Sequence, residues 1–160
     1  MISLIPMRSE NYAPYIKAAI ISYASDNVAA GRWLEAGALE RSHADFEKLL
    51  PQGLSTPNHF LYEIVADGCG PVGFAWLAIE RKHGAVSAFI YDIEIVPGAR
   101  RQGHASRALE ALESKAAAAG ASAIALNVFA NNHGAQALYQ KLGYAPTHFQ
   151  MRKPLGQKSA

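Results

Sequence analysis

The spacing of apolar side chains changes along the chain and predicts where helices and strands lie. Apolar residues recur every three or four positions over residues 12–30 and 39–50, which is typical of amphipathic helices. Runs that alternate, or that are apolar throughout, are typical of strands. These patterns predict helices at 12–30, 39–50, 101–119 and 134–142, and strands at 2–7, 60–66, 72–80, 86–96, 123–129 and 147–153.

Short turns join the three middle strands, and the later elements alternate between strand and helix. The turns DGCG and KHG connect 60–66, 72–80 and 86–96, which predicts an antiparallel meander. The helix at 101–119 then leads to the strand at 123–129, and a strand–helix–strand connection of this kind places its two strands in parallel. The sequence therefore predicts an α+β fold around a mixed, mostly antiparallel sheet.

The length and composition fit one domain and argue against several classes of protein. With 160 residues, half of them apolar, the chain is expected to form a single domain over residues 1–160. Its net charge is only +2 and its Lys and Arg residues are scattered, so no nucleic-acid partner is expected. No apolar run is long enough to cross a membrane, and the N-terminus does not resemble a signal peptide.

Cysteine usage and ligand spacing bear on metals and on location. The chain has one cysteine, Cys69, so a disulfide within the chain and a multi-cysteine metal site are both excluded. A single thiol fits a reducing compartment, and we expect a cytoplasmic protein. No set of His, Cys, Asp and Glu residues has the spacing of a metal site, so no metal is predicted.

The loop at residues 98–103 carries a clear chemical signal. It leads from the end of a strand directly into a helix, whose first N–H groups lack partners and carry a partial positive charge. Gly103 and Ala105 remove bulk where a ligand approaches the backbone, and Arg100 and Arg101 add positive charge. The loop matches neither the Walker A nor the GxGxxG pattern. It predicts a cradle for a pyrophosphate, although an ordinary strand-to-helix loop with surface arginines has the same composition.

A second informative passage follows one helix and one strand later, where residues 126–144 read LNVFANNHGAQALYQKLGY. The first passage fits the pattern Gln/Arg-x-x-Gly-x-Gly/Ala with Arg100, Gly103 and Ala105. Since both passages occur in the expected order, the chain resembles the GNAT superfamily of N-acetyltransferases. The matching positions of the second passage are Val128, Asn132, Ala135, Leu138, Tyr139, Gly143 and Tyr144.

This resemblance implies the GNAT fold, with helices on both faces of the sheet, and acetyl-CoA as cosubstrate. In similar enzymes the free strand edge that matches Ile95 and Val96 pairs with the pantetheine arm, which an asparagine matching Asn132 contacts from the other side. The tyrosine that matches Tyr139 protonates the departing thiolate, although Tyr139 could simply pack its helix on the sheet. The backbone donors for the pyrophosphate would come from Arg100, Arg101, Gln102, Gly103, His104, Ala105 and Ser106.

The resemblance leaves the general base open. Some relatives carry a glutamate at the position of Asn127, and an amide cannot accept the proton of the amine. Asp92 and Glu94 alternate with Ile93 and Ile95, so the two carboxylates share one face of a strand. Glu94 is the first candidate and Asp92 the second; a salt bridge or a solvated surface is the alternative for both.

The acceptor is not identified by the sequence. The first hypothesis is acetyl transfer to the primary amine of a small molecule, directly within a ternary complex. The alternatives are a peptide amine as acceptor, and an acyl-CoA-binding sensor domain that does no chemistry. A homodimer is left open.

Overall fold

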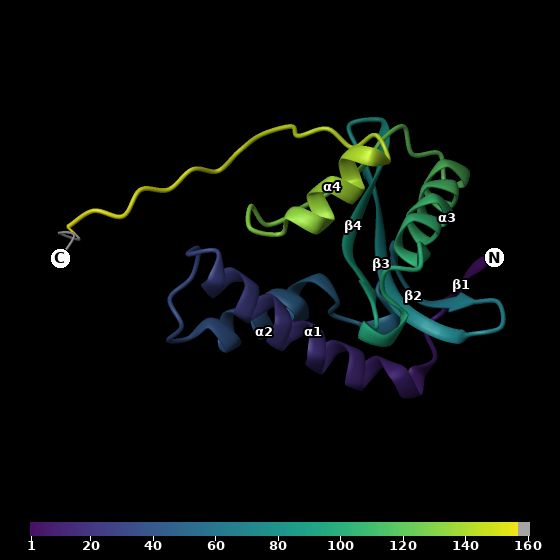
Figure 1. Cartoon of the computed structure of the whole chain (residues 1–160), viewed down its shortest axis with the longest axis horizontal. Coiled ribbons are helices and arrows are strands. Elements are labelled where there is room, and N and C mark those ends of the chain that lie inside the picture. The colour runs from purple at the N-terminus through teal and green to yellow at the C-terminus, as the bar shows by residue number, and fades with distance from the viewer. Residues whose placement is uncertain (157–160) are drawn as a thin grey trace.

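The centre of the protein is a five-stranded sheet, seen in a computed structural model that describes residues 1–156 (Figure 1). The strands lie in chain order from one edge of the sheet to the other. Neighbouring strands are antiparallel except for the last pair, which is parallel. The strands are β1 (Ile2–Pro6), β2 (His59–Ala66), β3 (Gly70–Lys82), β4 (Ala85–Ile95) and β5 (Ile124–Leu126).

Helices lie on both faces of this sheet, with the first two together on one face (Figure 1). Two short 3₁₀ turns, Gly53–Ser55 and Pro97–Ala99, occur in the connections. No helix among residues 1–156 is long and apolar enough to span a bilayer. The helices are α1 (Ser9–Ala29), α2 (Ala38–Leu49), α3 (His104–Ala118) and α4 (His133–Lys141).

Two adjacent residues of β3 show how the core is divided. Trp76 and Leu77 are each 1% exposed, and consecutive side chains of a strand point to opposite faces. Trp76 packs in the same cluster as Tyr15 of α1, whereas Leu77 packs in the cluster that contains Leu109 and Leu112 of α3. Each large side chain buried in this way contributes about 1.5–3 kcal/mol, so both helical layers are held firmly on the sheet.

A buried carboxylate anchors the start of α1. Glu63 of β2 is 3% exposed and accepts hydrogen bonds from the backbone N–H of Arg8 at 3.0 Å and from Nδ2 of Asn11 at 2.7 Å. The Arg8 guanidinium also donates to it at 3.2 Å, and this contact is the main reason why the pKa of Glu63 is lowered. The anchor fixes where α1 begins, and so where its next turns meet β4.

The predicted mixed sheet with helices on both faces is confirmed, while some predicted boundaries shift. The helix expected at 101–119 begins only at His104, because Arg101 and Gly103 adopt left-handed φ values of 63° and 77°. A residue in that region cannot continue a right-handed helix. The strand expected at 123–129 is limited to β5.

The strand predicted at 147–153 is wrong for the chain as it is folded here. These residues have no strand pairing and run away from the sheet as an extended trace (Figure 1). An alternating pattern shows only that a segment is able to pair; a strand also needs a neighbouring edge within reach. Phe149 and Met151, the apolar positions behind the prediction, are 82% and 90% exposed.

Candidate active site

A gap between two parallel strands forms the centre of the candidate site. Pairing between β4 and β5 runs only from Ala88↔Ile124 to Ile90↔Leu126. Beyond this point β4 continues to Ile95, whereas β5 has ended. The edge of β4 from residues 91 to 95 therefore has no strand neighbour on the β5 side within the described chain.

A bulge marks the place where the two strands separate. Trp76 pairs with Asp92 but Leu77 pairs with Ile90, so Tyr91 is an extra residue in β4. Such a bulge bends its strand and increases the local twist. The bend occurs directly before the open edge, and it accounts for the separation of β4 from β5.

The sequence predicted that the free backbone groups of this edge belong to Ile95 and Val96, and the structure differs in part. The Val96 N–H donates to Val72 on the β3 side at 2.9 Å, so it does not face the gap. Because backbone direction alternates along a strand, Ile93 and Ile95 face the gap instead. The Ile95 carbonyl already accepts a hydrogen bond from Nε of Arg100 at 2.9 Å. A ligand lying in the gap would therefore meet both backbone groups of Ile93 and the N–H of Ile95.

The loop before α3 has the geometry of an anion cradle. Gly103 is the N-cap of α3 and supplies no side-chain hydrogen bond, and no acidic residue lies in the first turn. The first N–H groups of the helix and its partial positive charge are thus available to an anion. Arg101 holds a left-handed φ of 63°, a conformation that costs about 1–3 kcal/mol and is concentrated at functional sites.

Arginine side chains brace the cradle. In addition to its bond with Ile95, the guanidinium of Arg100 lies 3.9 Å from Glu94. Nη2 of Arg107, one helical turn after Gly103, donates to the Gln102 carbonyl at 3.0 Å. Sequence reasoning missed Arg107, although its spacing of four residues from Gly103 was a usable signal.

His104 is a buried polar group without a partner. It begins α3 and is 7% exposed, and neither ring nitrogen has a hydrogen-bond partner among the described residues. Buried polar groups are nearly always paired, often with a bound ligand or water when the protein offers nothing. This unpaired imidazole lies in the predicted binding loop, where Ala105 and Ser106 after it are half-buried. The arrangement fits a loop that binds a polar ligand.

Asp92 and Glu94 lie in different surroundings. Asp92 is half-buried and accepts a hydrogen bond from the Tyr15 hydroxyl at 2.7 Å. The pKa of Asp92 is raised to about 6, mainly by burial and in part by the charges of Glu94 and Asp26, while the Tyr15 hydrogen bond acts in the opposite direction. The side chain of Glu94 is 52% exposed and faces Arg100. The ionisation of Asp92 therefore falls near neutral pH.

The remaining predicted residues lie on or beside α4. Burial and the charge of Asp92 both raise the pKa of Tyr139, so its phenol stays protonated at neutral pH. The Tyr139 ring packs 5.7 Å from that of Tyr144, whose hydroxyl donates to Glu113 at 3.1 Å. Asn132 caps α4 through its side-chain oxygen, which accepts the N–H of Ala135 at 3.2 Å. The fold thus brings Tyr139 within electrostatic range of Asp92.

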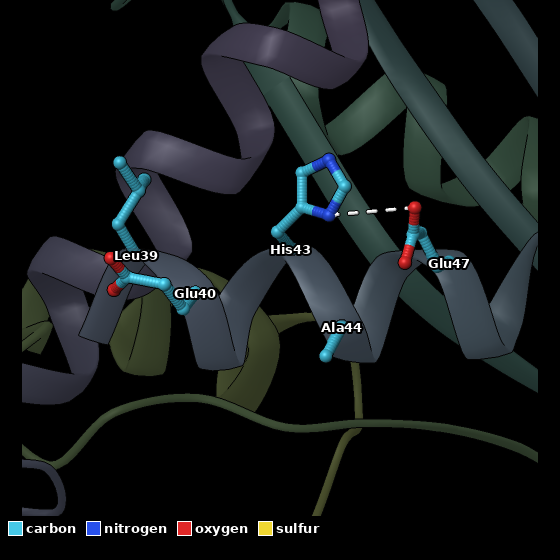
Figure 2. Close-up of a pocket in the computed structure, with 5 residues that line it drawn as sticks. All are labelled: Leu39, Glu40, His43, Ala44 and Glu47. Atoms are coloured by element: carbon cyan, nitrogen blue, oxygen red, sulfur yellow. Dashed lines mark ion pairs between the residues drawn. The ribbon is translucent and has the colours of Figure 1, made fainter. Parts of the chain in front are cut away.

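Surface hollows lie apart from this group of residues. One follows the outer surface of α2, where His43 and Glu47 form an ion pair of 3.6 Å (Figure 2). A smaller one lies between α1 and α2 and is lined by residues such as Tyr12 and Phe46. Neither is lined by a predicted site residue.

Comparison with known proteins agrees with this fold. The model of the Acetyltransferase (GNAT) family matches residues 26–144. The chain is 35% identical to the uncharacterized N-acetyltransferase YdgE of Bacillus subtilis (strain 168) over 153 residues, 96% of this chain and 98% of that protein. It is 37% identical to YycN of the same organism, also an uncharacterized N-acetyltransferase, over 154 residues, 96% of this chain and 99% of that protein.

The crystal structure of YycN from Bacillus subtilis superposes with a TM-score of 0.93, covering 98% of this chain and 100% of that one at 36% identity. Fold, family model and full-length relatives therefore agree. The chain belongs to the GNAT family and is an acetyltransferase.

Proposed function

We propose that this acetyltransferase moves the acetyl group of acetyl-CoA to the primary amine of a small molecule, directly within a ternary complex. The observation that carries the proposal is that Asp92 and Tyr139 lie near enough to each other to interact electrostatically. These residues come from β4 and α4, and the charge of one affects the pKa of the other. One can accept a proton near neutral pH while the other can donate one, which is what amine acetylation requires.

The cosubstrate would lie along the loop and the gap. The free N–H groups at the start of α3, from Arg101 to Ser106, would bind the pyrophosphate of CoA. The pantetheine arm would then run along the open edge of β4, pairing with Ile93 and Ile95 as an added strand does. On this course Asn132, at the start of α4, would contact the arm from its other side. The thioester would reach the region between Asp92 and Tyr139.

The proposed reaction needs three proton transfers and no covalent enzyme intermediate. Asp92 accepts a proton from the ammonium form of the substrate, and the free amine attacks the thioester carbonyl carbon to give a tetrahedral intermediate whose nitrogen still carries an extra proton. As the intermediate collapses and the C–S bond breaks, the Tyr139 hydroxyl gives its proton to the CoA thiolate. The extra proton on nitrogen restores the Tyr139 hydroxyl, and Asp92 releases its proton to solvent, which leaves the neutral amide and free CoA. Cys69, the one thiol of the chain, is exposed in the turn between β2 and β3, on other elements than the gap.

The contacts favour Asp92 over Glu94 as the base. With a pKa of about 6, Asp92 is mostly ionised at neutral pH yet remains a stronger base than an ordinary carboxylate. Glu94 is half-exposed, and its carboxylate already faces the Arg100 guanidinium at 3.9 Å. We therefore assign Glu94 to the rim of the gap, where it helps Arg100 brace the cradle.

A thiol-release assay across a panel of amines tests the proposal. The panel contains aliphatic polyamines, amino sugars, free amino acids and peptides with free N-termini or lysines. We expect turnover with a small amine, and a loss of about 10²–10⁴-fold in kcat for Tyr139→Phe with unchanged acetyl-CoA affinity. Turnover with peptides alone would replace the small-molecule acceptor. Acetyl-CoA binding without turnover on any amine would support a sensor domain instead.

A further inference from the structure

Three half-buried rings lie together on the face of the sheet that carries α1 and α2. They belong to His59 of β2 and to Phe89 and Tyr91 of β4, and they are called the aromatic shelf below. The centroid of the Tyr91 ring lies 4.7 Å from that of Phe89 and 5.7 Å from that of His59. Trp76, which is 1% exposed and packs in the core with Tyr15, stacks on Tyr91 at 4.7 Å.

Packing of the core does not account for the aromatic shelf. Among residues 1–156, Phe89 is not one of those that pack against either core cluster, although its ring is large and apolar. Trp76 and His59 both lie against Tyr91 but are only 5.8 Å from each other, so they lie on the same face of its ring. The opposite face of Tyr91 is covered by neither. Adjacent apolar side chains left partly open on a surface are typical of a binding site.

The bulge in β4 places the aromatic shelf directly beside the proposed base. Successive side chains of a regular strand point to opposite faces. Asp92 pairs with Trp76, so the two side chains share a face, and Tyr91 stacks on Trp76 on that same face. Tyr91 and Asp92 are therefore consecutive residues that point to one side of the sheet. A ligand that rests on Tyr91 lies within a short arm's length of the Asp92 carboxylate.

This side of the sheet is also the one from which an amine can reach Asp92. The course proposed for the cosubstrate follows the open edge of β4, whereas the Asp92 carboxylate lies on the α1 side, where it bonds to Tyr15. Asp26 of α1 adds negative charge within electrostatic range of Asp92, which favours an approaching ammonium group. Burial lowers the pKa of His59, so its imidazole is neutral at neutral pH and does not repel that group.

We propose that the acceptor is a primary amine on a short arm of an aromatic ring, whose ring stacks on the aromatic shelf while its amine lies at Asp92. This inference rests on the function proposed above and names the substrate class of the same site. Aromatic rings prefer one another in offset-stacked or edge-to-face contacts. The aromatic shelf offers both, since Tyr91 presents a face and Phe89 stands at 61° to it. A saturated or linear amine would cover the same area without these contacts.

Matched amines test the need for an aromatic ring. Phenylethylamine, cyclohexylethylamine and hexylamine carry similar apolar groups, but only the first is aromatic. Steady-state kinetics with saturating acetyl-CoA should give the phenyl compound a kcat/KM about 2–10-fold above that of the cyclohexyl compound, which is what an aromatic pair adds beyond buried area. Equal values for these two, or a preference for hexylamine or for an aliphatic diamine, would overturn the proposal.

The variant Tyr91→Leu tests the residue that carries the inference. It removes the ring and keeps an apolar side chain, so the preference for the phenyl compound should disappear. Phe60→Leu is the matched control, because it removes a ring that is 43% exposed on β2 and pairs with Leu77, on the other face of the sheet. The control should keep the wild-type preference. A folded Tyr91→Leu enzyme that still prefers the phenyl compound would count against the aromatic shelf.

A binding experiment on the wild-type enzyme separates this inference from the proposed function, and it remains decisive if Tyr91→Leu does not fold. Calorimetric titration in the presence of CoA should show tighter binding of phenylethylamine than of cyclohexylethylamine. Tighter binding of the phenyl compound without acetylation of any amine would contradict the proposed function and support the aromatic shelf. Acetylation of all three amines with equal kcat/KM and equal affinity would support the function and overturn the aromatic shelf.

Discussion

Two carboxyl groups on one strand show how position alone separates their chemistry. Asp92 and Glu94 have the same charge and lie two residues apart, but only Asp92 is covered by α1 and bonded to Tyr15. Burial disfavours a charged carboxylate, which is why the pKa of Asp92 rises to about 6. The proposed base therefore owes its strength to a helix distant in sequence.

The comparison of Asp92→Asn with Glu94→Gln tests this assignment. We expect Asp92→Asn to lose about 10²-fold or more in kcat/KM at pH 7, and Glu94→Gln to lose less than about tenfold. The loss for Asp92→Asn should shrink as pH rises, because more of the amine then arrives unprotonated. Initial rates measured over a pH series with saturating acetyl-CoA provide the check. The reverse order of the two losses would assign the base to Glu94.

A change at Tyr15 should move the pH dependence in a known direction. The rate of the wild-type enzyme should fall as pH drops through about 6, where Asp92 takes up its proton. The Tyr15 hydroxyl bonds to the ionised carboxylate and lowers that pKa, so Tyr15→Phe should raise it. The acid limb of the kcat/KM profile should therefore shift to higher pH. Tyr12→Phe is a suitable control on the same helix, and a limb that stays in place or shifts downward would contradict the assignment.

Strands and helices differ in how far the sequence predicts them. The loop that leads from β4 into α3 was predictable because strand end, glycine and helix start all lie within ten residues, where local rules apply. The absence of a strand at 147–153 was not predictable, because pairing with a neighbouring strand depends on where α4 directs the chain that follows it. The contact between Tyr15 and Asp92 joins residues 77 positions apart, so no local pattern indicates it. For the same reason the sequence does not indicate the pKa of Asp92, which this contact helps to set.

The close approach of β3 and β4 makes one glycine indispensable. A Cβ atom on Gly73 would overlap the carbonyl oxygen of Glu94. That oxygen belongs to the backbone of β4, so it cannot move aside without displacing the strand. We expect Gly73→Ala to lower the free energy of unfolding by about 1–3 kcal/mol, as overpacking does. It should also weaken acetyl-CoA binding, since the displaced part of β4 borders the gap.

Urea unfolding and calorimetric titration measure these two effects. Gly134→Ala is the matched control, because a Cβ atom there meets open space and Gly134 lies within a helix. That variant should be as stable as the wild type or slightly more stable. A Gly73→Ala protein with wild-type stability and affinity would show that β3 and β4 can separate freely.

At the scale of the whole molecule, ligand binding should be visible as stability. A ligand at 100 times its Kd stabilises the folded state by about 2.7 kcal/mol. In a chain of this size that raises Tm by about 5–10 °C, and we expect this shift with acetyl-CoA in a thermal scan. Pantetheine, which lacks the pyrophosphate, should give a much smaller shift at the same concentration. Equal shifts for both ligands would place the binding energy outside the cradle.

Gly103→Val offers a protein control for the same scan. Gly103 has a φ of 77°, and an added Cβ atom would lie 3.1 Å from the guanidinium of Arg107. The variant should lose most of the acetyl-CoA shift, even after its own lower Tm is taken into account.

The bulge at Tyr91 also decides which side chains of β4 face the core. Before it the even-numbered residues Ala88 and Ile90 pack in the core on the α3 side, whereas after it the odd-numbered Ile93 and Ile95 do. The inserted residue thus moves the core-facing positions of the strand from even-numbered to odd-numbered residues. If the bulge were straightened with Tyr91 kept in the strand, both carboxylates would rotate into the apolar core beneath α3, at a cost of several kcal/mol for each buried charge. Deletion of Tyr91 would instead restore simple alternation and leave Asp92 and Glu94 on the opposite face, so the extra residue is needed for the bend that opens the gap and not for burying Ile93 and Ile95.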